Sequence, residues 1–243
     1  NPKVLKNEKV SEIPTAILML MNTPKACPSA GSCRSVCLIT SGNPIYLDNK
    51  IKCRIRRNNA FMSDYSIFLR YLVVNCFRHY AKNRTADKVG FRLNGVSDYA
   101  WEDFSVKLTA EDTDYIKNAF NIYIEPIRYG SVIEAVQKAI DLNNNELLKN
   151  SIQFYDYTKR IDRNFDKCKN ELNYHLTLSH GSKHDTFKKA LELGLNYAAA
   201  FNLKKSQELP KQFTYKGIKL NVIDGDITDY RPLDNNNKTN IVG

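Results

Sequence analysis

The chain has 243 residues, of which 42% are apolar, and its 36 Lys and Arg outnumber 26 Asp and Glu, so the net charge is +10. This length can bury a sizeable core. The basic surplus favours nucleic acid as a partner, although a basic protein without such a partner has the same composition. Six cysteines at these spacings do not resemble a small secreted disulfide scaffold.

No apolar run reaches the roughly 18 residues that a membrane span requires. The longest, "IPTAILMLM" at 13–21, is short and lacks the charged flank of a signal peptide. We therefore expect a cytoplasmic protein without a membrane partner, in a cell or an infected cell. Because the sequence begins with Asn1 rather than Met, we also expect residues to be missing at its ends.

In chain order, residues 13–21 predict a buried strand, and residues 53–83 carry apolar side chains at helical spacing. Residues 114–127 fit either a helix or a strand, whereas 130–143 favour a helix. A further helix is predicted over 183–194, with Gly194 as its C-cap. Further strands are predicted over 88–95, 151–158, 173–181, 195–202 and 217–226.

Alternation of strands and helices predicts an α/β fold with a largely parallel sheet. We expect a single domain over 1–243, with a strand and cysteine loop in 13–52 and the remaining strand–helix units in 53–243. Chemistry in such folds sits at the carboxyl ends of the strands. Many polar residues follow the predicted strands, for example Asn94 and Lys159.

Three cysteines, Cys27, Cys33 and Cys37, lie within eleven residues in the stretch "CPSAGSCRSVC". Thiolates are soft ligands that suit zinc or an iron–sulfur cluster. The spacing Cys-x5-Cys-x3-Cys supports zinc and an iron–sulfur cluster about equally. The alternative to a metal site is three free cysteines packed beside a core strand. Cys53 is the nearest candidate for a fourth ligand, and His175 is another. Cys76 lies on an apolar helix face, where we expect it to be part of the core.

Several sequence blocks together resemble the bacteriophage "gene product 88" family over about residues 13–243. In chain order they are "IPTAILMLMNTPKACPSAGSCRSVCLITSG", "RRNNAF", "GFRLNGVSDYAWEDF", "IQFYDYTKR", "NYHLTLSHG" and "VIDGDITDYRPLD…IVG". The layout of that family looks like a partial (β/α) barrel of the radical-SAM kind, with the cysteine loop after the first strand. The resemblance implies a [4Fe–4S] cluster held by Cys27, Cys33 and Cys37, and S-adenosylmethionine as a further cofactor.

The chain departs from the radical-SAM pattern in two respects. That pattern is Cys-x3-Cys-x2-Cys, and here both intervals are longer. No Gly-Gly-Glu-like strand end is present to hold the methionine part of S-adenosylmethionine. Zinc therefore stays as the lesser alternative cofactor, and whether the protein is an enzyme stays open.

Two of the predicted strands carry further candidate site residues. Arg92 and Asn94 share one face of a strand by parity, and Asp98 follows in the next turn. Alternatively, Asn94-Gly95 and Ser97-Asp98 serve only to form a turn, because both pairs are common in turns. In "FYDYTK", Tyr155 and Tyr157 share a face, and Lys159 ends the strand, where its cation could meet a carboxylate or phosphate. Arg92, Asn94, Asp98 and Lys159 are the catalytic candidates if the protein is an enzyme.

The stretch "DGDITDYR" at 224–231 places three carboxylates within six residues. With Tyr155 and Tyr157, Asp224 is a candidate cofactor-binding residue, although these acids could equally cap turns and pair with Arg231. A metal-dependent nuclease using His175, Asp224 and Asp226 is a third hypothesis.

The leading hypothesis is an iron–sulfur protein that acts on or binds nucleic acid. The runner-up is a non-enzymatic DNA- or RNA-binding protein with a structural metal. Segments 52–59, 77–84 and 157–163 interleave Arg and Lys with other side chains, including aromatics, as a phosphate-contacting surface does, or as a solvated helix face does. The oligomeric state is not predictable from these features.

Overall fold

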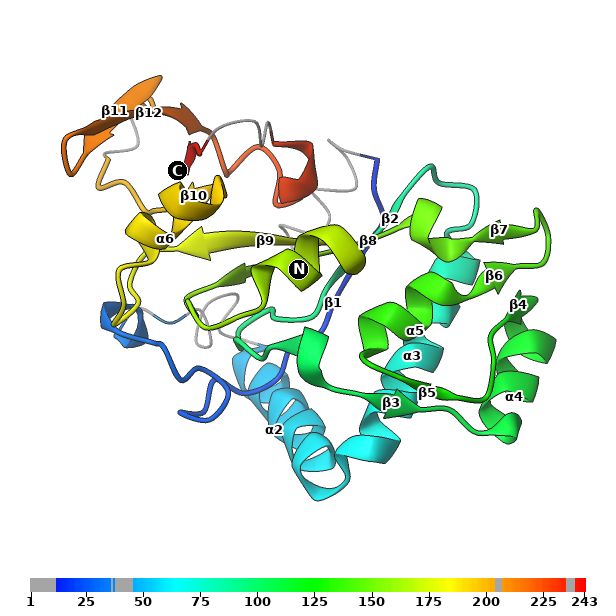
Figure 1. Cartoon of the computed structure of the whole chain (residues 1–243). Helices are drawn as coiled ribbons and strands as arrows, with labels where there is room; N and C mark the ends of the chain where they lie inside the picture. Colours follow the sequence, from blue (N-terminus) through cyan, green and yellow to red (C-terminus); the bar gives the residue numbers. More distant parts are fainter. Residues whose placement is uncertain (1–11, 36, 38–45, 204–206, 235–238) are drawn as a thin grey trace.

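The computed structural model describes residues 12–35, 37, 46–203, 207–234 and 239–243 (Figure 1). Residues 36 and 38–45, which belong to the predicted cysteine-loop segment, lie outside the described residues. Within the described ranges, no helix is both long and apolar enough to cross a bilayer.

An eight-stranded sheet forms the centre of the molecule, in the order β1-β2-β8-β9-β10-β13-β12-β11. All neighbouring pairs are parallel except β11 and β12, which form an antiparallel hairpin. The fold is therefore α/β with a mostly parallel sheet, as predicted. From β1 to β13, the strands lie in order of increasing residue number, although β3 to β7 come between β2 and β8 in the chain and the β11–β12 hairpin comes between β10 and β13. The strands are β1 (Thr15–Ile17), β2 (Val89–Arg92), β8 (Ile152–Thr158), β9 (Tyr174–Ser179), β10 (Tyr197–Ala198), β11 (Gln212–Tyr215), β12 (Ile218–Ile223) and β13 (Ile241–Val242).

The predicted positions of the sheet strands are confirmed, but β1, β2 and β10 are shorter than predicted. Strands β11 and β13 were not predicted. Three of the four β11 side chains are exposed, so this strand carries no buried face for a pattern to reveal, and β13 has only two residues. β8 has the opposite character, since Phe154, Tyr155 and Asp156 are all fully buried. Burial on both faces is typical of a central strand in a parallel sheet.

The single helix predicted over 53–83 is wrong, because two helices occupy this region: α2 (Leu47–Ser63) and α3 (Tyr65–Lys82). The break is at Asp64, whose backbone is extended (φ −150°, ψ 89°) and whose side chain accepts a hydrogen bond from the Ile67 N–H. An Asp that caps the next helix competes with continuation of the previous one. The predicted apolar face is interrupted there, and Tyr65 is 59% exposed.

An insertion between β2 and β8 packs on α3 and lies to one side of the main sheet (Figure 1). Residues 114–127, which fitted either structure, contain the end of a helix followed by a short strand. The helix predicted over 130–143 ends at Lys138, because Ala139 is extended and β6 pairs with β4 and β7. The elements of the insertion are β3 (Val106–Lys107), α4 (Ala110–Phe120), β4 (Ile122–Tyr123), β5 (Arg128–Tyr129), α5 (Val132–Lys138), β6 (Ile140–Asp141) and β7 (Glu146–Leu147).

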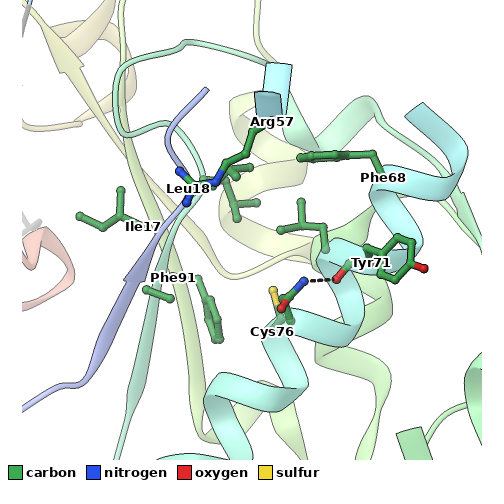
Figure 2. Close-up of a pocket in the computed structure, with 11 residues that line it drawn as sticks. Ile17, Leu18, Arg57, Phe68, Tyr71, Cys76 and Phe91 are labelled. Atoms are coloured by element: carbon green, nitrogen blue, oxygen red, sulfur yellow. Dashed lines mark hydrogen bonds between the residues drawn. The ribbon is translucent and has the colours of Figure 1, made fainter. Parts of the chain in front are cut away.

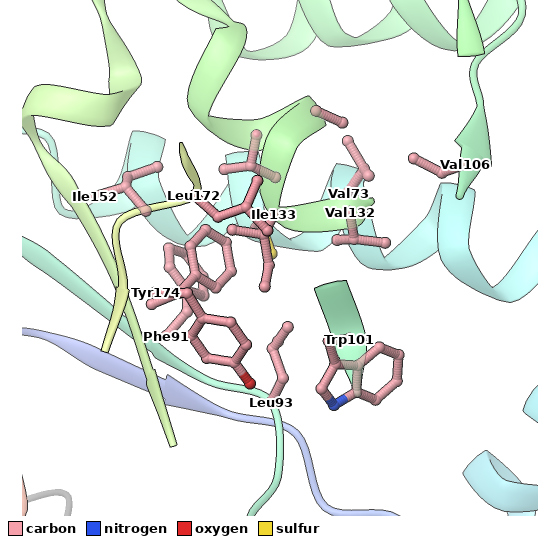
Figure 3. Close-up of a cluster of buried hydrophobic side chains, with 14 of the residues drawn as sticks. Val73, Phe91, Leu93, Trp101, Val106, Val132, Ile133, Ile152, Leu172 and Tyr174 are labelled. Carbon is pink, nitrogen blue, oxygen red and sulfur yellow. The ribbon is translucent and has the colours of Figure 1, made fainter. Parts of the chain in front are cut away.

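The main core lies between the sheet, α3 and α5. Figure 3 shows Val73 of α3, Ile133 of α5 and Phe91 of β2 converging there. Cys76 is 2% exposed and belongs to this core, as predicted. On the other part of the sheet, α6 (Thr186–Leu193) packs against β9 and ends at Gly194, whose left-handed backbone (φ +64°) confirms the predicted C-cap.

Candidate functional site

A cavity of about 370 Å³ lies where the carboxyl ends of β2 and β8 meet the cysteine loop. Parallel strands bring their carboxyl ends to the same edge of a sheet, which gathers residues that are remote in the sequence. Eight of the predicted site residues line this cavity: Cys27, Cys33, Cys37, Arg92, Asn94, Asp98, Tyr157 and Lys159.

The cysteine loop is held against the turn between β9 and α6. The backbone N–H of Gly31 donates to the Gly181 carbonyl at 2.9 Å, and the Lys183 N–H donates to the Ser29 carbonyl at 3.1 Å. A Cβ atom on Gly31 would lie 2.8 Å from the Lys183 nitrogen, so only glycine permits this approach. Gly181 has a φ of +84°, and a Cβ atom added to it would lie 2.9 Å from the Cys33 Cβ. Two glycines thus allow the loop to dock on the sheet.

The three thiols have different surroundings. The Cys37 sulfur accepts a hydrogen bond from the Asn22 side-chain amide at 2.9 Å. The pKa of the Cys27 thiol is raised to about 12, mainly by burial and also by the charges of Asp98 and the other two cysteines, while Lys159 acts in the opposite direction. Each of these charges is therefore close to Cys27. A Cys27 thiol with this pKa is neutral at pH 7 unless a cation stabilises its thiolate.

Asn94 organises the turn that follows β2. Its side-chain oxygen accepts hydrogen bonds from the Ser97 hydroxyl, the Tyr99 N–H and the Trp101 indole N–H, each at 3.0 Å. Its amide nitrogen donates to the Tyr99 carbonyl at 2.9 Å. Asn94 therefore stabilises a turn, as the alternative interpretation predicted, and it also lines the cavity.

Asp98 and Lys159 are joined at the end of β8. The Asp98 carboxylate accepts hydrogen bonds from the Thr158 hydroxyl at 2.7 Å and from the Lys159 N–H at 2.8 Å. The Lys159 ammonium donates to the Ser179 hydroxyl at 2.9 Å. Burial raises the pKa of Asp98, and the nearby Arg163 is the strongest influence that opposes this shift.

A buried carboxylate, Asp156, lies beneath the cavity. It accepts hydrogen bonds from the backbone N–H groups of Leu93 and Asn94 and from the Tyr174 hydroxyl, the last at 2.5 Å. Burial raises the pKa of Asp156 to about 6, while the Tyr174 hydrogen bond and the Arg92 charge act in the opposite direction. Asp156 thereby ties β2, β8 and β9 together below the site.

Arg92 reaches the cavity with a partner that sequence reasoning did not single out, Asp229. The guanidinium lies 2.5 Å from the Asp229 carboxylate and 4.7 Å from the centre of the Tyr157 ring. The Tyr157 hydroxyl donates to the same carboxylate at 3.3 Å. Asp229 is one of the three acids of the 224–231 stretch, but sequence spacing could not show which of them turns toward β2.

Two of the predicted cofactor-binding residues lie elsewhere. Tyr155 is fully buried and packs edge-on against Tyr230, with ring centres 5.1 Å apart. Asp224 is exposed, and its carboxylate accepts a hydrogen bond from the Asp226 N–H at 2.8 Å, which is the turn role that was its alternative. β8 therefore presents Tyr157, but not Tyr155, to the cavity.

The hypothetical further metal ligands are also separate from the cavity lining. Cys53 lies on α2, where its sulfur accepts a hydrogen bond from Arg56 at 3.2 Å. Burial, with a smaller contribution from Arg231, lowers the pKa of His175 to about 4. Among the residues that the structure describes, no three or more His, Cys, Asp or Glu side chains are grouped so that they could hold a metal ion.

The motifs and the sheet order are accompanied by a match to a protein family over almost the whole chain. The family model described as gene product 88 matches residues 1–242. The chain belongs to the gene product 88 family. This confirms the bacteriophage family that the motifs resemble, and its blocks supply both the cysteine loop and β8 of the cavity. No curated protein and no solved structure matches this gene product 88 protein.

Proposed function

We propose that this protein binds a [4Fe–4S] cluster through Cys27, Cys33 and Cys37, in a partial barrel of the radical-SAM kind. One observation carries the proposal: three thiols of one loop line a single cavity at the carboxyl ends of parallel strands. The chain-order arrangement of β1, β2, β8, β9, β10 and β13 supports the barrel-like part, because (β/α) barrels add their strands in sequence order.

The donor types in the cavity fit such a cluster. Iron–sulfur clusters are held by cysteine thiolates, and cations nearby favour the ionised form of a thiol. Arg34, Arg92 and Lys159 line the same cavity as the thiols, and Lys159 opposes the burial that raises the pKa of Cys27. Since the described side chains are not grouped as a ready metal site, binding requires the three thiols to turn toward one another inside the cavity. Zinc would use the same thiolates and is the alternative occupant.

A cluster of this kind supplies, when bound, an electron for the reductive cleavage of S-adenosylmethionine. We propose that the remaining polar groups of the cavity orient that co-substrate. The Lys159 ammonium donates a hydrogen bond to the neutral Ser179 hydroxyl and is placed to meet a carboxylate. The Tyr157 ring lies under the Arg92 guanidinium, which Asp229 holds in place. The substrate class that we propose is nucleic acid, because of the net charge of +10.

The test is the metal content of protein purified without oxygen. Visible absorption and the iron, sulfide and zinc contents are measured for the wild type, Cys33→Ala and the control Cys168→Ala. Cys168 is a thiol buried in the core, away from the cavity lining. We expect broad visible absorption with equal iron and sulfide in the wild type and in Cys168→Ala, and its loss in Cys33→Ala.

Zinc in place of iron, or a cluster that survives Cys33→Ala, contradicts the proposal. Zinc bound in the wild type and lost in Cys33→Ala would support the runner-up, a nucleic-acid-binding protein with a structural metal. Binding of S-adenosylmethionine to the cluster-loaded protein is measured next by calorimetry. We expect Lys159→Met to weaken it while the iron content is unchanged.

A further inference from the structure

A second cavity, of about 380 Å³, lies between the sheet edge and the helices α2 and α3. Its floor is apolar and includes Cys76 and Phe91, and its rim carries Arg57 of α2 and Tyr71 of α3. Figure 2 shows Arg57 reaching from α2 toward Leu18, with Phe68 and Tyr71 on the side of α3. An apolar cavity with few polar rim groups suits a flat ring with a polar edge.

The surface around this cavity is basic. Lys52, Arg56 and Arg57 are exposed on α2, whose only acidic residue is Asp48. Within the described part of the chain, no carboxylate forms an ion pair with these three cations. Cations without acidic partners on one helix favour a polyanion as the occupant of this face.

Exposed aromatic side chains accompany the cations. Tyr71 is 65% exposed at the cavity rim, and Tyr65, in the first turn of α3, is 59% exposed. An aromatic ring exposed to water is stabilised when it stacks on another ring, because apolar surface is removed from water. Basic grooves with exposed aromatic platforms are typical of proteins that bind single-stranded nucleic acid.

Helix α2 also approaches the cysteine loop. Arg54 and Arg57 are three residues apart and therefore lie on the same side of the helix. Arg57 lines the second cavity, whereas Arg54 is 5% exposed. Burial lowers the pKa of Arg54, and the charge of Cys37 opposes this shift, which places Arg54 near the cysteine loop.

We propose that α2 and α3 bind single-stranded nucleic acid, with phosphates on Lys52, Arg56 and Arg57 and one base in the cavity beside Tyr71. The base must be unpaired to enter the cavity, because both faces and the pairing edge of a paired base are already in contact within the duplex. This inference goes beyond the proposed function and does not depend on it, since none of the residues used is a thiol of the cysteine loop.

The test measures the binding of fluorescently labelled oligothymidine and oligouridine by anisotropy at low salt. The variants are Tyr71→Ala and Arg57→Ala. Their matched controls are Tyr123→Ala and Arg128→Ala, which remove an exposed tyrosine and an exposed arginine from the insertion. Stacking of one base contributes enough that we expect roughly tenfold weaker binding for Tyr71→Ala. For Arg57→Ala, we expect weaker binding and a salt dependence whose slope falls by about one.

Equal effects of Tyr71→Ala and Tyr123→Ala would overturn the proposal, as would absence of binding by the wild type at low salt. Tighter binding to duplex than to single strands would also overturn it. Thermal unfolding of each variant checks that the fold is retained. Binding that persists in Cys33→Ala supports the proposal independently of the cluster, and binding that is lost in folded Cys33→Ala contradicts it.

Discussion

The buried ion pair between Glu102 and Arg163 gives the sharpest stability prediction. Both side chains are fully buried. The guanidinium makes two hydrogen bonds to the carboxylate, at 2.8 Å and 2.5 Å. The guanidinium also lies 5.1 Å from the Tyr174 ring centre, and Tyr174 in turn donates to Asp156 beneath the cavity. This pair therefore supports the floor of the candidate site.

Glu102→Gln leaves the Arg163 charge buried without the carboxylate that accepts its two hydrogen bonds. Removing one member of a buried pair typically costs about 3–5 kcal/mol. The chain offers a matched control in Arg160 and Asp162, which also form a two-hydrogen-bond pair but with Asp162 64% exposed. Asp162→Asn should cost only about 0–1 kcal/mol, because water solvates the remaining Arg.

The measurement is urea-induced unfolding of the wild type and both variants, followed by circular dichroism at pH 7. The free energy of unfolding should fall several times more for Glu102→Gln than for Asp162→Asn. The double variant Glu102→Leu with Arg163→Met should recover much of the loss, because no buried charge is left. The reasoning is refuted if Glu102→Gln costs less than about 1 kcal/mol or no more than Asp162→Asn.

Three further predictions concern groups around the cavity. Gly31→Ala places a Cβ 2.8 Å from backbone atoms of the β9–α6 turn, so we expect about 1–3 kcal/mol of lost unfolding free energy in urea titrations; an unchanged midpoint would show that the loop is not docked. Asn94→Ala leaves buried donors of Ser97 and Trp101 without their acceptor, and we expect a loss of about 2–4 kcal/mol in the same titration. The pKa of Asp156 is raised by burial from 3.8 to about 6, so the folded state binds the proton more tightly than the unfolded state. The contribution of Asp156 to stability is therefore fully present below pH 4 and is lost as the pH rises to about 6, by up to about 3 kcal/mol; Asp156→Asn should flatten this part of the unfolding profile, and an identical wild-type and variant slope would contradict the assignment.

The predicted sheet and much of the cavity lining follow from short-range patterns. Most residues of β8 and β9 are buried, and apolar side chains recur along both strands. Polar residues that follow β2 and β8, such as Asn94 and Lys159, line the cavity. The end of a helix was predictable only where the sequence has a residue that strongly favours a helix C-cap, such as Gly194. At Asp64 the helical spacing continues on both sides, so the pattern alone did not reveal that its carboxylate starts a new helix.

Residues whose role depends on long-range contacts were not predictable. Asp224, Asp226 and Asp229 are alike in sequence, yet only Asp229 contacts Arg92, because the chain from β12 to β13 brings it back over β2 and β8. The second cavity was missed because its apolar floor on β1 and β2 and its aromatic rim on α3 come from separate segments.

The sequence by itself determined the α/β class, the positions of six of the eight strands of the main sheet, the cysteine loop and the family, because periodicity and ordered motifs are local properties. Only the tertiary structure decided which side chains share a cavity. Neighbouring parallel strands place their carboxyl ends at one edge whatever separates them in the chain, so Cys27, Asn94 and Lys159 meet through the sheet rather than through their spacing.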